Sequence, residues 1–313
     1  MSLVSIIVPI YNGKDFIRQT ILQIENQTYR EYEVLFVDDG STDGTRNILK
    51  KFLAISAIEK WSVLESLHLG LAHARNLGII NAKGEFIAFL DCDDKWHPEK
   101  LQYQVEAMKD SEVDVVFSQT VGFDKLSEKT QPHNSTARCG DPSQILKSEY
   151  VIYGGGSNVL IRSRLVREIG LFDESLLFAE DLDYWIRAMT AGTFLEIPYK
   201  HVFINFRNDS MQRKNDIDIK IQILKSLIAI YNKWKDWNPL LIRRITMQLF
   251  SEQIHAALKK RNWDYAKQIL SLIIDQSKEL SADEVKTEYF FYFLLLYSQA
   301  KYSLTRLMRK VKI

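Results

Sequence analysis

The stretch GEFIAFLDCDD, residues 84–94, joins an apolar segment directly to three aspartates. The run from Glu85 to Leu90 has the length and composition of a buried strand. Because aspartate is common in turns, Asp91, Asp93 and Asp94 could simply lie on a solvated turn between a strand and a helix. Carboxylates repel one another, however, and Mg²⁺ or Mn²⁺ binds through one or two carboxylates together with substrate phosphates. The stretch alone therefore leaves a turn and a cation site open.

The spacing of the aspartates adds a geometric expectation. Alternate side chains of an extended chain project to the same side. If this segment continues the strand, Asp91 and Asp93 reach one bound ligand together. Cys92 then points the other way, into packing.

Short apolar runs alternate with amphipathic stretches through the first half of the chain. This alternation predicts an α/β fold with a mostly parallel, Rossmann-like sheet covered on both faces. Leu71 to Asn81 is expected to be a helix that is interrupted at Gly78. The expected strands are Val4 to Pro9, Tyr32 to Val37, Trp61 to Leu64, Glu85 to Leu90 and Val113 to Ser118.

Polar motifs follow several of these strands. PIYNG, DDGSTDGT and DCDD each stand at the carboxyl end of an expected strand. Ligands of such sheets bind outside the carboxyl ends of the strands. Asp38 and Asp39 end one strand, where a carboxylate either accepts the imide hydrogen of a uracil ring or caps the next helix.

The motif AEDLDYWIR, residues 179–187, is a further acidic cluster. Asp183 and Arg187 are four residues apart and are expected to pair on a helix surface. Asp181 lies in the first helical turn, where negative charge is favoured. The cluster is either simple helix-start chemistry or a general base beside the aromatic ring of Trp185.

Composition limits the classes of function. A net charge of +1 gives no overall field that would attract nucleic acid. The two cysteines, Cys92 and Cys139, make neither a disulfide framework nor a zinc site and fit a reducing cytosol. VSIIVPI is too short for a signal peptide, and no run approaches the ~20 apolar residues of a membrane span. A cytoplasmic protein is expected.

Five motifs occur in one order and together resemble the inverting glycosyltransferases of family 2, which have the GT-A fold. The resemblance implies metal-dependent transfer of a sugar from a nucleotide-diphosphate donor to a hydroxyl of a glycan or lipid-linked acceptor, in the synthesis of a cell-surface polysaccharide. The motifs are VSIIVPIYNG at 4–13, VLFVDDGSTDGT at 34–45, LGLAHARNLGIINAKGEFIAFLDCDD at 69–94, GLFDE at 170–174 and EDLDYWIR at 180–187.

The resemblance assigns donor-binding roles to several residues. Pro9 and Tyr11 line the nucleoside pocket, and Asp38 reads the base. Arg75 lies near the base and the diphosphate, and Asp91 touches the ribose. Because a carboxylate at Asp38 suits uracil, a UDP-sugar is the expected donor.

The same resemblance assigns the metal to Asp93 and the catalytic base to Asp181. The cofactor would be Mn²⁺ or Mg²⁺, which stabilises the charge that develops on the leaving diphosphate. One carboxylate that deprotonates the acceptor supports a single displacement, which inverts the anomeric centre. The family's DADD or DSDD is DCDD here, which keeps a small side chain between the first two aspartates.

Two other functions stay open. A strand that ends in D-x-D also fits an aspartate-nucleophile phosphatase, although Lys95 stands where that family has Thr or Val. A non-catalytic protein that binds a sugar nucleotide is the second alternative.

The expected domains are a GT-A domain at 1–212 and a helical C-terminal region at 213–313. The GT-A domain has a nucleotide half at about 1–118 and an acceptor half at about 119–212. The C-terminal helices end in an aromatic and a basic segment, which fits contact with an anionic membrane surface as well as packing on a neighbouring domain or subunit.

Three features of the acceptor half have two interpretations each. YGGGSN, residues 153–158, is either a floor for the acceptor or a tight turn. Lys125 to Cys139 is either a lid that closes over the donor or a polar loop. His201 is either a third metal ligand or a packed histidine, and Arg207 matches a basic family position that could face the diphosphate.

Overall fold

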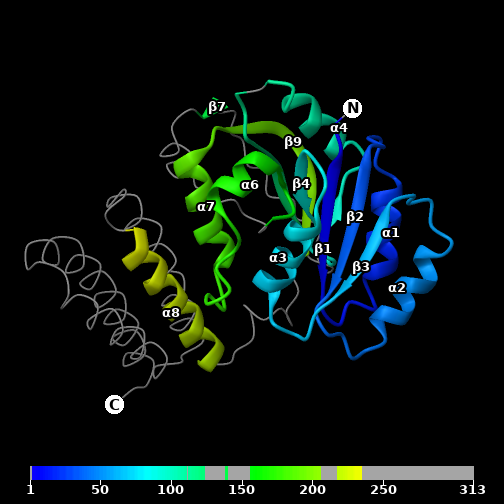
Figure 1. Ribbon diagram of the computed structural model, residues 1–313, viewed down its shortest axis with the longest axis horizontal. Helices are drawn as coiled ribbons and strands as arrows, with labels where there is room; N and C mark the ends of the chain where they lie inside the picture. The colour runs from blue at the N-terminus through cyan, green and yellow to red at the C-terminus, as the bar shows by residue number, and fades with distance from the viewer. Residues whose placement is uncertain (1, 111, 124–137, 140–155, 206–216, 235–313) are drawn as a thin grey trace, which may run out of the picture. The chain divides into compact units, whose positions relative to one another are not determined.

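The computed structural model describes only part of the chain. The coordinates group into compact units at residues 1–245 and 246–313, and the second unit lies outside the described residues. The predicted domain boundary at 212 stays a prediction, because the surrounding residues are not described. The predicted lid is outside the description except for residues 138–139. The described residues, drawn in colour in Figure 1, are 2–110, 112–123, 138–139, 156–205 and 217–234.

The first part of the sheet is built from four parallel strands. β1 is the central strand and pairs with β2 on one side and β4 on the other, while β3 extends the sheet beyond β2. The strands are β1 (Val4–Ile10), β2 (Tyr32–Asp38), β3 (Trp61–Glu65) and β4 (Phe86–Phe89). The helices that connect them are α1 (Ile17–Glu25), α2 (Thr45–Leu53) and α3 (Leu71–Asn81).

The later strands continue the same sheet with antiparallel and parallel pairs. The order is β3-β2-β1-β4-β8-β6-β9-β5, and β7 pairs with β9. This mixed α/β sheet confirms the predicted fold class. The strands are β5 (Lys95–Trp96), β6 (Val115–Phe123), β7 (Arg138–Cys139), β8 (Val159–Arg162) and β9 (Phe194–Asn205). The helices are α4 (Lys100–Ala107), α6 (Ser163–Ile169), α7 (Glu180–Ala191) and α8 (Ile217–Trp234). No helix within these described ranges is long and apolar enough to cross a membrane.

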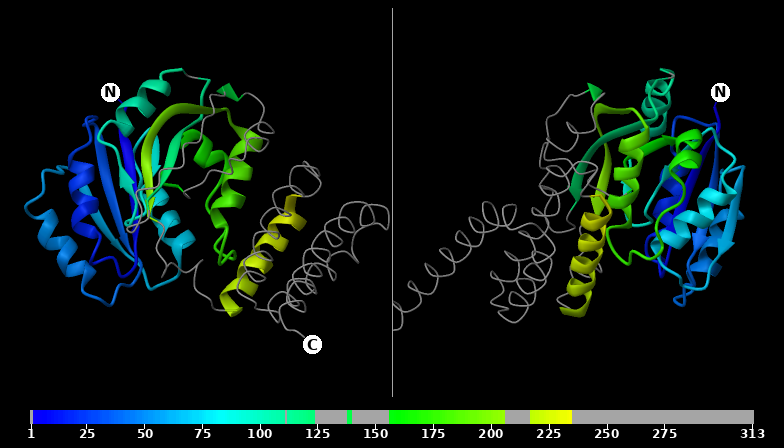
Figure 2. Two further views of the ribbon diagram at one scale, coloured as in Figure 1. Left: turned by 180° about the vertical axis from the view of Figure 1, so that it is seen from behind. Right: turned by 60° about the vertical axis from the view of Figure 1, so that its left-hand side comes forward.

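Alternation along the strands divides the sheet into two faces. Every second residue of β1, such as Ile6 and Val8, packs into one hydrophobic core with Ile21 of α1 and Leu49 of α2. Figures 1 and 2 show α1 and α2 on one side of the strands and α3 on the other. Ile7 points to this second face and meets Gly78 of α3. The sheet is therefore covered on both faces, as predicted.

The carboxyl ends of β1, β2 and β4 lie at one edge of the sheet. Ile10 is the register partner of Asp38, and the amide of Asp39 donates to the carbonyl of Ile10 at 2.8 Å. The amide of Leu90 donates to the carbonyl of Ile7 at 2.9 Å. Asp38 ends β2, and Tyr11, Asp91 and Asp93 lie in the loops after β1 and β4, so the sheet brings these predicted residues to a common edge.

The predicted interruption of α3 at Gly78 is wrong, because the helix is continuous from Leu71 to Asn81. A Cβ at residue 78 would lie 2.3 Å from Cγ2 of Ile7. Glycine is needed there because α3 lies too close to β1 for a methyl group. The close approach, and not a break in the helix, explains the residue.

We expect Gly78→Ala to lower the free energy of unfolding by about 1–3 kcal/mol, because the added methyl overpacks the contact with β1. Alanine favours a helix by about 1 kcal/mol over glycine, so any gain would contradict the steric account. Urea unfolding of the full chain measures the change. Ile7→Ala is the matched partner: combined with Gly78→Ala, it should cost less than the sum of the single changes.

Candidate active site

The DCDD segment forms a turn. β4 ends at Phe89, and the amide of Asp94 donates to the carbonyl of Asp91 at 3.0 Å. The expectation that Asp91 and Asp93 lie on an extended strand is therefore wrong, because the chain must reverse here to enter β5. Cys92 is half-buried and packs against the hydrophobic core, as expected. Asp91 and Asp93 are both half-buried.

Asp94 anchors this turn to two other segments. Its Oδ2 accepts a hydrogen bond from Ser157 Oγ at 2.6 Å, and its Oδ1 accepts one from the amide of Asn205 at 3.1 Å. The amide of Asp91 donates to Ser157 Oγ at 3.1 Å. Burial and the charge of Asp91 raise the pKa of Asp94 well above its ordinary value. The described end of the YGGGSN motif, Gly156 to Asn158, therefore fixes the turn.

Arg75 of α3 joins the turn to α7. Its guanidinium donates to Glu180 Oε1 at 2.8 Å and to the two carboxylate oxygens of Asp91 at 3.1 and 3.2 Å. Arg75 is 1% exposed. Burial disfavours this charge, but the carboxylates of Asp91 and Glu180 outweigh burial and raise the pKa of Arg75. A single cation thus bridges the first aspartate of DCDD and the first residue of α7.

Negative charge is in excess around this guanidinium. Burial, and then the charge of Asp181, raise the pKa of Glu180 to about 7 in spite of the contact with Arg75. Burial also raises the pKa of Asp181 above its ordinary value. Carboxylates that are held so close together repel one another, so a further cation bound among them would be favourable.

These carboxylates therefore suit a hard divalent metal ion that takes few of its ligands from the protein. Within the described part of the chain, no three His, Cys, Asp or Glu side chains are grouped so as to hold a metal ion by themselves. Mg²⁺ and Mn²⁺ sites often consist of one or two carboxylates plus substrate phosphates and water. Asp93, in the turn, fits such a site. Its role as a metal ligand stays a prediction.

The end of the edge where a nucleoside was predicted to bind is formed by the loops after β1, β2 and β3. Tyr11 is 46% exposed, and its ring stacks on His68 with centroids 3.9 Å apart. Asp39 accepts hydrogen bonds from the amides of Leu69 and Gly70, both at 2.9 Å, which holds the His68 loop beside β2. An open hollow of about 580 Å³ adjoins this loop. It is lined by Gly40, Ser41, Thr42, Gly44, Arg46, Asn47, Ser66, Leu67 and His68.

Asp38 is less accessible than its predicted role requires. Its side chain is fully buried, and Oδ2 accepts a bond from Arg46 Nε at 2.7 Å. Oδ1 accepts a bond from the amide of Ser41 at 3.0 Å. A base could reach this carboxylate only after Arg46 moved aside. Pro9 is buried in β1 opposite Val37, so its contact with a nucleoside, like the base reading by Asp38, stays a prediction.

Sequence reasoning missed three features of this region. Glu180 was read only as helix-start charge, although its position beside Asp181 could have suggested a buried partner for Arg75. Arg46 pairs with Asp38 across the DDGSTDGT turn, and no helical or strand spacing signals this ion pair. The expected surface pair of Asp183 and Arg187 exists, but Asp183 is fully buried.

His201 fits the packed interpretation. Its ring lies 5.2–5.4 Å, between centroids, from those of His97, Tyr103 and Tyr199. Burial, followed by the charges of His97 and Lys100, lowers the pKa of His201 to about 4. Among the described residues, no aspartate contact to this ring supports a metal role. Arg207 lies outside the described residues.

Comparison with known proteins identifies the fold and the family in turn. The chain is similar to S. aureus TarS 1–349 in complex with UDP-GlcNAc, with a TM-score of 0.60, 23% identity and coverage of 75% of this chain and 67% of that one. It is also similar to the mannosyltransferase PcManGT from Pyrobaculum calidifontis in complex with GDP-Man and Mn²⁺, with a TM-score of 0.59, 19% identity and coverage of 98% and 82%. These likenesses establish the GT-A fold.

The sequence itself matches the family described as "Glycosyl transferase family 2" over residues 5–170, which is more than half of the chain. The chain belongs to this family and is a glycosyltransferase. A relative from Rickettsia prowazekii, "Uncharacterized glycosyltransferase RP339", is 28% identical and covers 88% of this chain and 85% of its own length. The "Putative teichuronic acid biosynthesis glycosyltransferase TuaG" of Bacillus subtilis is 43% identical over 106 residues, which are 34% of this chain and 42% of that protein.

We expect the buried Glu180 to make stability depend on pH. The unfolded carboxyl loses its proton near pH 4.5, whereas the folded one keeps it up to about pH 7. The stabilisation from this group is therefore present at low pH and is lost as the pH rises through about 7. Its size is about 3 kcal/mol, since one pKa unit corresponds to about 1.4 kcal/mol.

Urea unfolding of wild type and Glu180→Gln from pH 4.5 to 8 measures this term. The stability of wild type relative to the variant should fall across that range. Glu106→Gln, at an exposed position, is the control and should follow wild type. Parallel profiles for wild type and Glu180→Gln would contradict the burial account.

Proposed function

We propose that the chain is an inverting glycosyltransferase that moves a sugar from a UDP-sugar to a hydroxyl of a glycan or lipid-linked acceptor. The carrying observation is the buried bridge of Arg75 between Asp91 and Glu180. It holds a donor-side aspartate and the first turn of α7, where Asp181 lies, on a single guanidinium. Both halves of a transfer reaction, leaving-group binding and acceptor deprotonation, then meet at one edge of the sheet.

The donor assignment is supported by what similar proteins bind. TarS was solved with UDP-GlcNAc and PcManGT with GDP-Man and Mn²⁺, so both hold nucleotide-diphosphate sugars. We assign UDP to this chain because the carboxylate of Asp38, once Arg46 moves aside, would accept the imide hydrogen of uracil. Tyr11 and Pro9 would line the nucleoside pocket, and Asp91 would bind the ribose.

The metal assignment rests on the excess of carboxylates. Asp93 would bind Mn²⁺ or Mg²⁺ at the DCDD turn, and the bound ion would stabilise negative charge on the diphosphate as a Lewis acid. Arg75 fixes the carboxylate of Asp91 beside that turn. The hydrogen bonds of Asp94 to Ser157 and Asn205 keep the turn in place.

The base assignment rests on the surroundings of Asp181. Its pKa is raised by burial, which brings a carboxylate closer to the operating pH of a general base. In the proposed step the carboxylate takes the proton of the acceptor hydroxyl. The acceptor oxygen then forms its bond to the sugar C1 as the bond from C1 to the diphosphate breaks, and the diphosphate leaves with that electron pair. One displacement inverts the anomeric centre.

The relatives support the proposed biological setting. TuaG is described as acting in teichuronic acid biosynthesis, which supports a role for this chain in making a surface polysaccharide. A cytoplasmic location, with the C-terminal helices on the inner face of a membrane, is part of the same proposal. The residues that would make that contact lie outside the described part of the chain.

A thermal-shift screen of UDP, GDP and dTDP, with and without Mn²⁺, tests the donor assignment. A ligand that binds only the folded state adds about 2.7 kcal/mol at a hundredfold excess over its dissociation constant. UDP with Mn²⁺ should raise the melting temperature most. No shift with any of the three, in the presence of Mn²⁺, would instead point to a protein that is not a sugar-nucleotide enzyme.

Asp181→Asn and Asp93→Asn should separate the two halves of the reaction. Asp181→Asn should lower transfer by about 10²–10⁴-fold, because the general base is lost, and should leave the binding of UDP with Mn²⁺ intact. Asp93→Asn should weaken the Mn²⁺-dependent part of UDP binding. Calorimetry with UDP and a transfer assay with the selected donor measure both. A wild-type rate of sugar transfer in Asp181→Asn would contradict the assignment of Asp181 as the base.

A further inference from the structure

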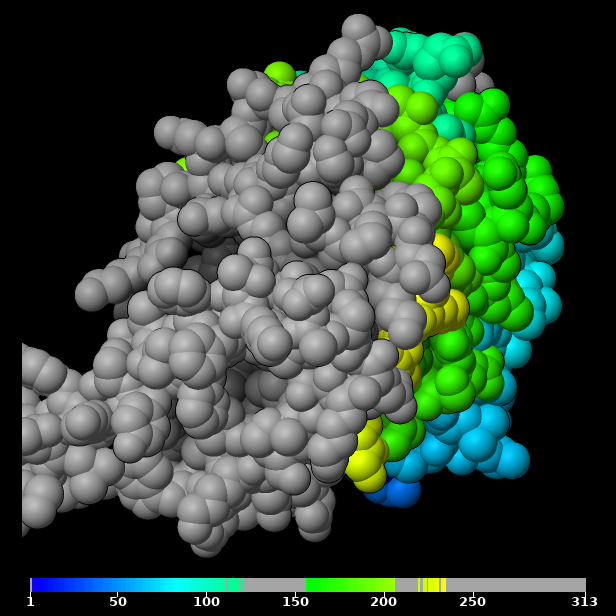
Figure 3. All heavy atoms as spheres, turned by 90° about the vertical axis from the view of Figure 1, so that its left-hand side faces the viewer, coloured from blue at the N-terminus to red at the C-terminus, as the bar shows by residue number. Residues whose placement is uncertain are grey.

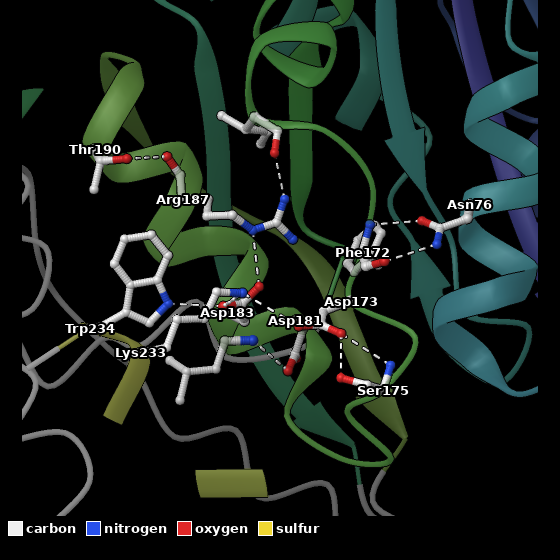
Figure 4. A network of polar contacts seen from close by, with 12 residues as sticks. Asn76, Phe172, Asp173, Ser175, Asp181, Asp183, Arg187, Thr190, Lys233 and Trp234 are labelled. Carbon is white, nitrogen blue, oxygen red and sulfur yellow. Dashed lines mark hydrogen bonds and ion pairs between the residues drawn. The ribbon is translucent and has the colours of Figure 1, made fainter. Parts of the chain in front are cut away.

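Asp183, in the first turn of α7, has a set of contacts that the proposed reaction does not use. Arg187, one turn later, donates from Nε to Asp183 Oδ2 at 3.0 Å. Lys233 Nζ and Trp234 Nε1, both at the end of α8, reach Asp183 Oδ1 at 2.8 and 2.9 Å. Figure 4 shows these groups converging on the carboxylate next to Asp181. Because Asp183 is fully buried, loss of a partner would leave a costly uncompensated charge.

An apolar stripe on α8 leads to these two donors. Ile223, Leu227 and Ile230 are buried at 9, 2 and 1% exposure. Their spacing of three and four residues places them on one face of the helix, and the same face continues to Lys233 and Trp234. Figure 3 shows α8, in yellow, in contact with the green surface of residues 156–205. α8 therefore buries one of its faces, and its last turn delivers a cation and an N–H group to Asp183.

The contacts continue from Asp183 to the candidate active site. The guanidinium of Arg187 lies 5.0 Å from the ring centroid of Tyr184, which stacks on Phe172 at 3.8 Å. Asn76 of α3 binds both the amide and the carbonyl of Phe172, at 2.8 and 3.0 Å (Figure 4). The guanidinium of Arg75 lies 5.4 Å from the same ring. The first turns of α7 are thus held between α8 on one side and α3 on the other.

We propose that Lys233 and Trp234 are positioning residues for the transfer step. By holding the carboxylate of Asp183 they fix the first turn of α7, and with it Asp181, two residues earlier, against Arg75. This inference rests on the proposed role of Asp181 as the base. Lys233 and Trp234 lie beyond the matched residues 5–170, as do Glu180 and Asp181, so helices after that segment would complete the active site.

Lys233→Met and Trp234→Phe, each made in the full chain, test the proposal. Each variant removes one donor and keeps most of the side-chain volume. Lys225→Met, at an exposed position on the same helix, is the matched control. The measurements are amide hydrogen exchange over residues 180–191, the affinity for UDP with Mn²⁺, and the rate of UDP release from UDP-N-acetylglucosamine with water as the acceptor.

Both variants should exchange the α7 amides about tenfold faster than wild type. UDP affinity should not change, and UDP release should fall by about 10- to 100-fold, because a displacement of about 1 Å at the base has an effect of that size. Lys225→Met should match wild type in all three. Unchanged amide hydrogen exchange of α7 in both variants overturns the proposal. Faster exchange combined with a wild-type rate of UDP release also overturns it, because α8 would then only pack against the rest of the chain.

The double variant Asp183→Asn with Lys233→Met tests the same contact in an experiment that needs no sugar nucleotide. Removing the charge at both ends should restore much of the α7 protection that Lys233→Met loses. If it restores none, the proposal is overturned whichever sugar the enzyme uses. Asp181→Asn keeps the two proposals apart: UDP release that persists in Asp181→Asn refutes the base assignment, whereas release that persists only in Lys233→Met and Trp234→Phe refutes the positioning role.

Discussion

The buried guanidinium of Arg75 is the interaction on which the site depends. Arg75 belongs to α3, which packs on β1 where Gly78 meets Ile7. Its guanidinium binds both Asp91 and Glu180. Without this cation, two carboxylates from distant segments would repel each other in a poorly solvated place. The close packing of α3 on β1 therefore has an electrostatic consequence, because it delivers the charge that allows the acidic segments to meet.

Much of the fold could be predicted because its signals are local. The apolar runs of β1, β2 and β4 and the polar motifs after them are visible in single windows of sequence, and the rule for parallel sheets puts their carboxyl ends together. Family resemblance then supplied what periodicity cannot, namely a role for Asp181. β9 was missed because Pro198 and polar residues interrupt the segment from Phe194 to Asn205, and because its pairing with β6 is long-range.

The remaining features of the site depend on contacts between residues that are far apart in the sequence. Arg75 and Glu180 are 105 residues apart, and Asp183 and Trp234 are 51 apart. Helical spacing correctly paired Asp183 with Arg187, but spacing says nothing about burial, and burial changes a weak surface pair into a constraint on the whole helix. The DCDD turn was misjudged for a related reason, since its shape is set by Ser157 and Asn205 and not by its own residues.

Charge balance explains why the first turn of α7 needs support from two sides. Glu180 and Asp181 are kept close to Asp91, and Arg75 is the one cation that the described residues place among them. Burial raises the pKa values of both Glu180 and Asp181. Repulsion of this kind favours moving α7 away from the DCDD turn when no further cation is bound. Asp183 opposes that movement, because its buried contacts fix the same turn from the far side. Under the proposed function, the site would then stay assembled before a cation and a diphosphate bind, while it still carries an excess of negative charge.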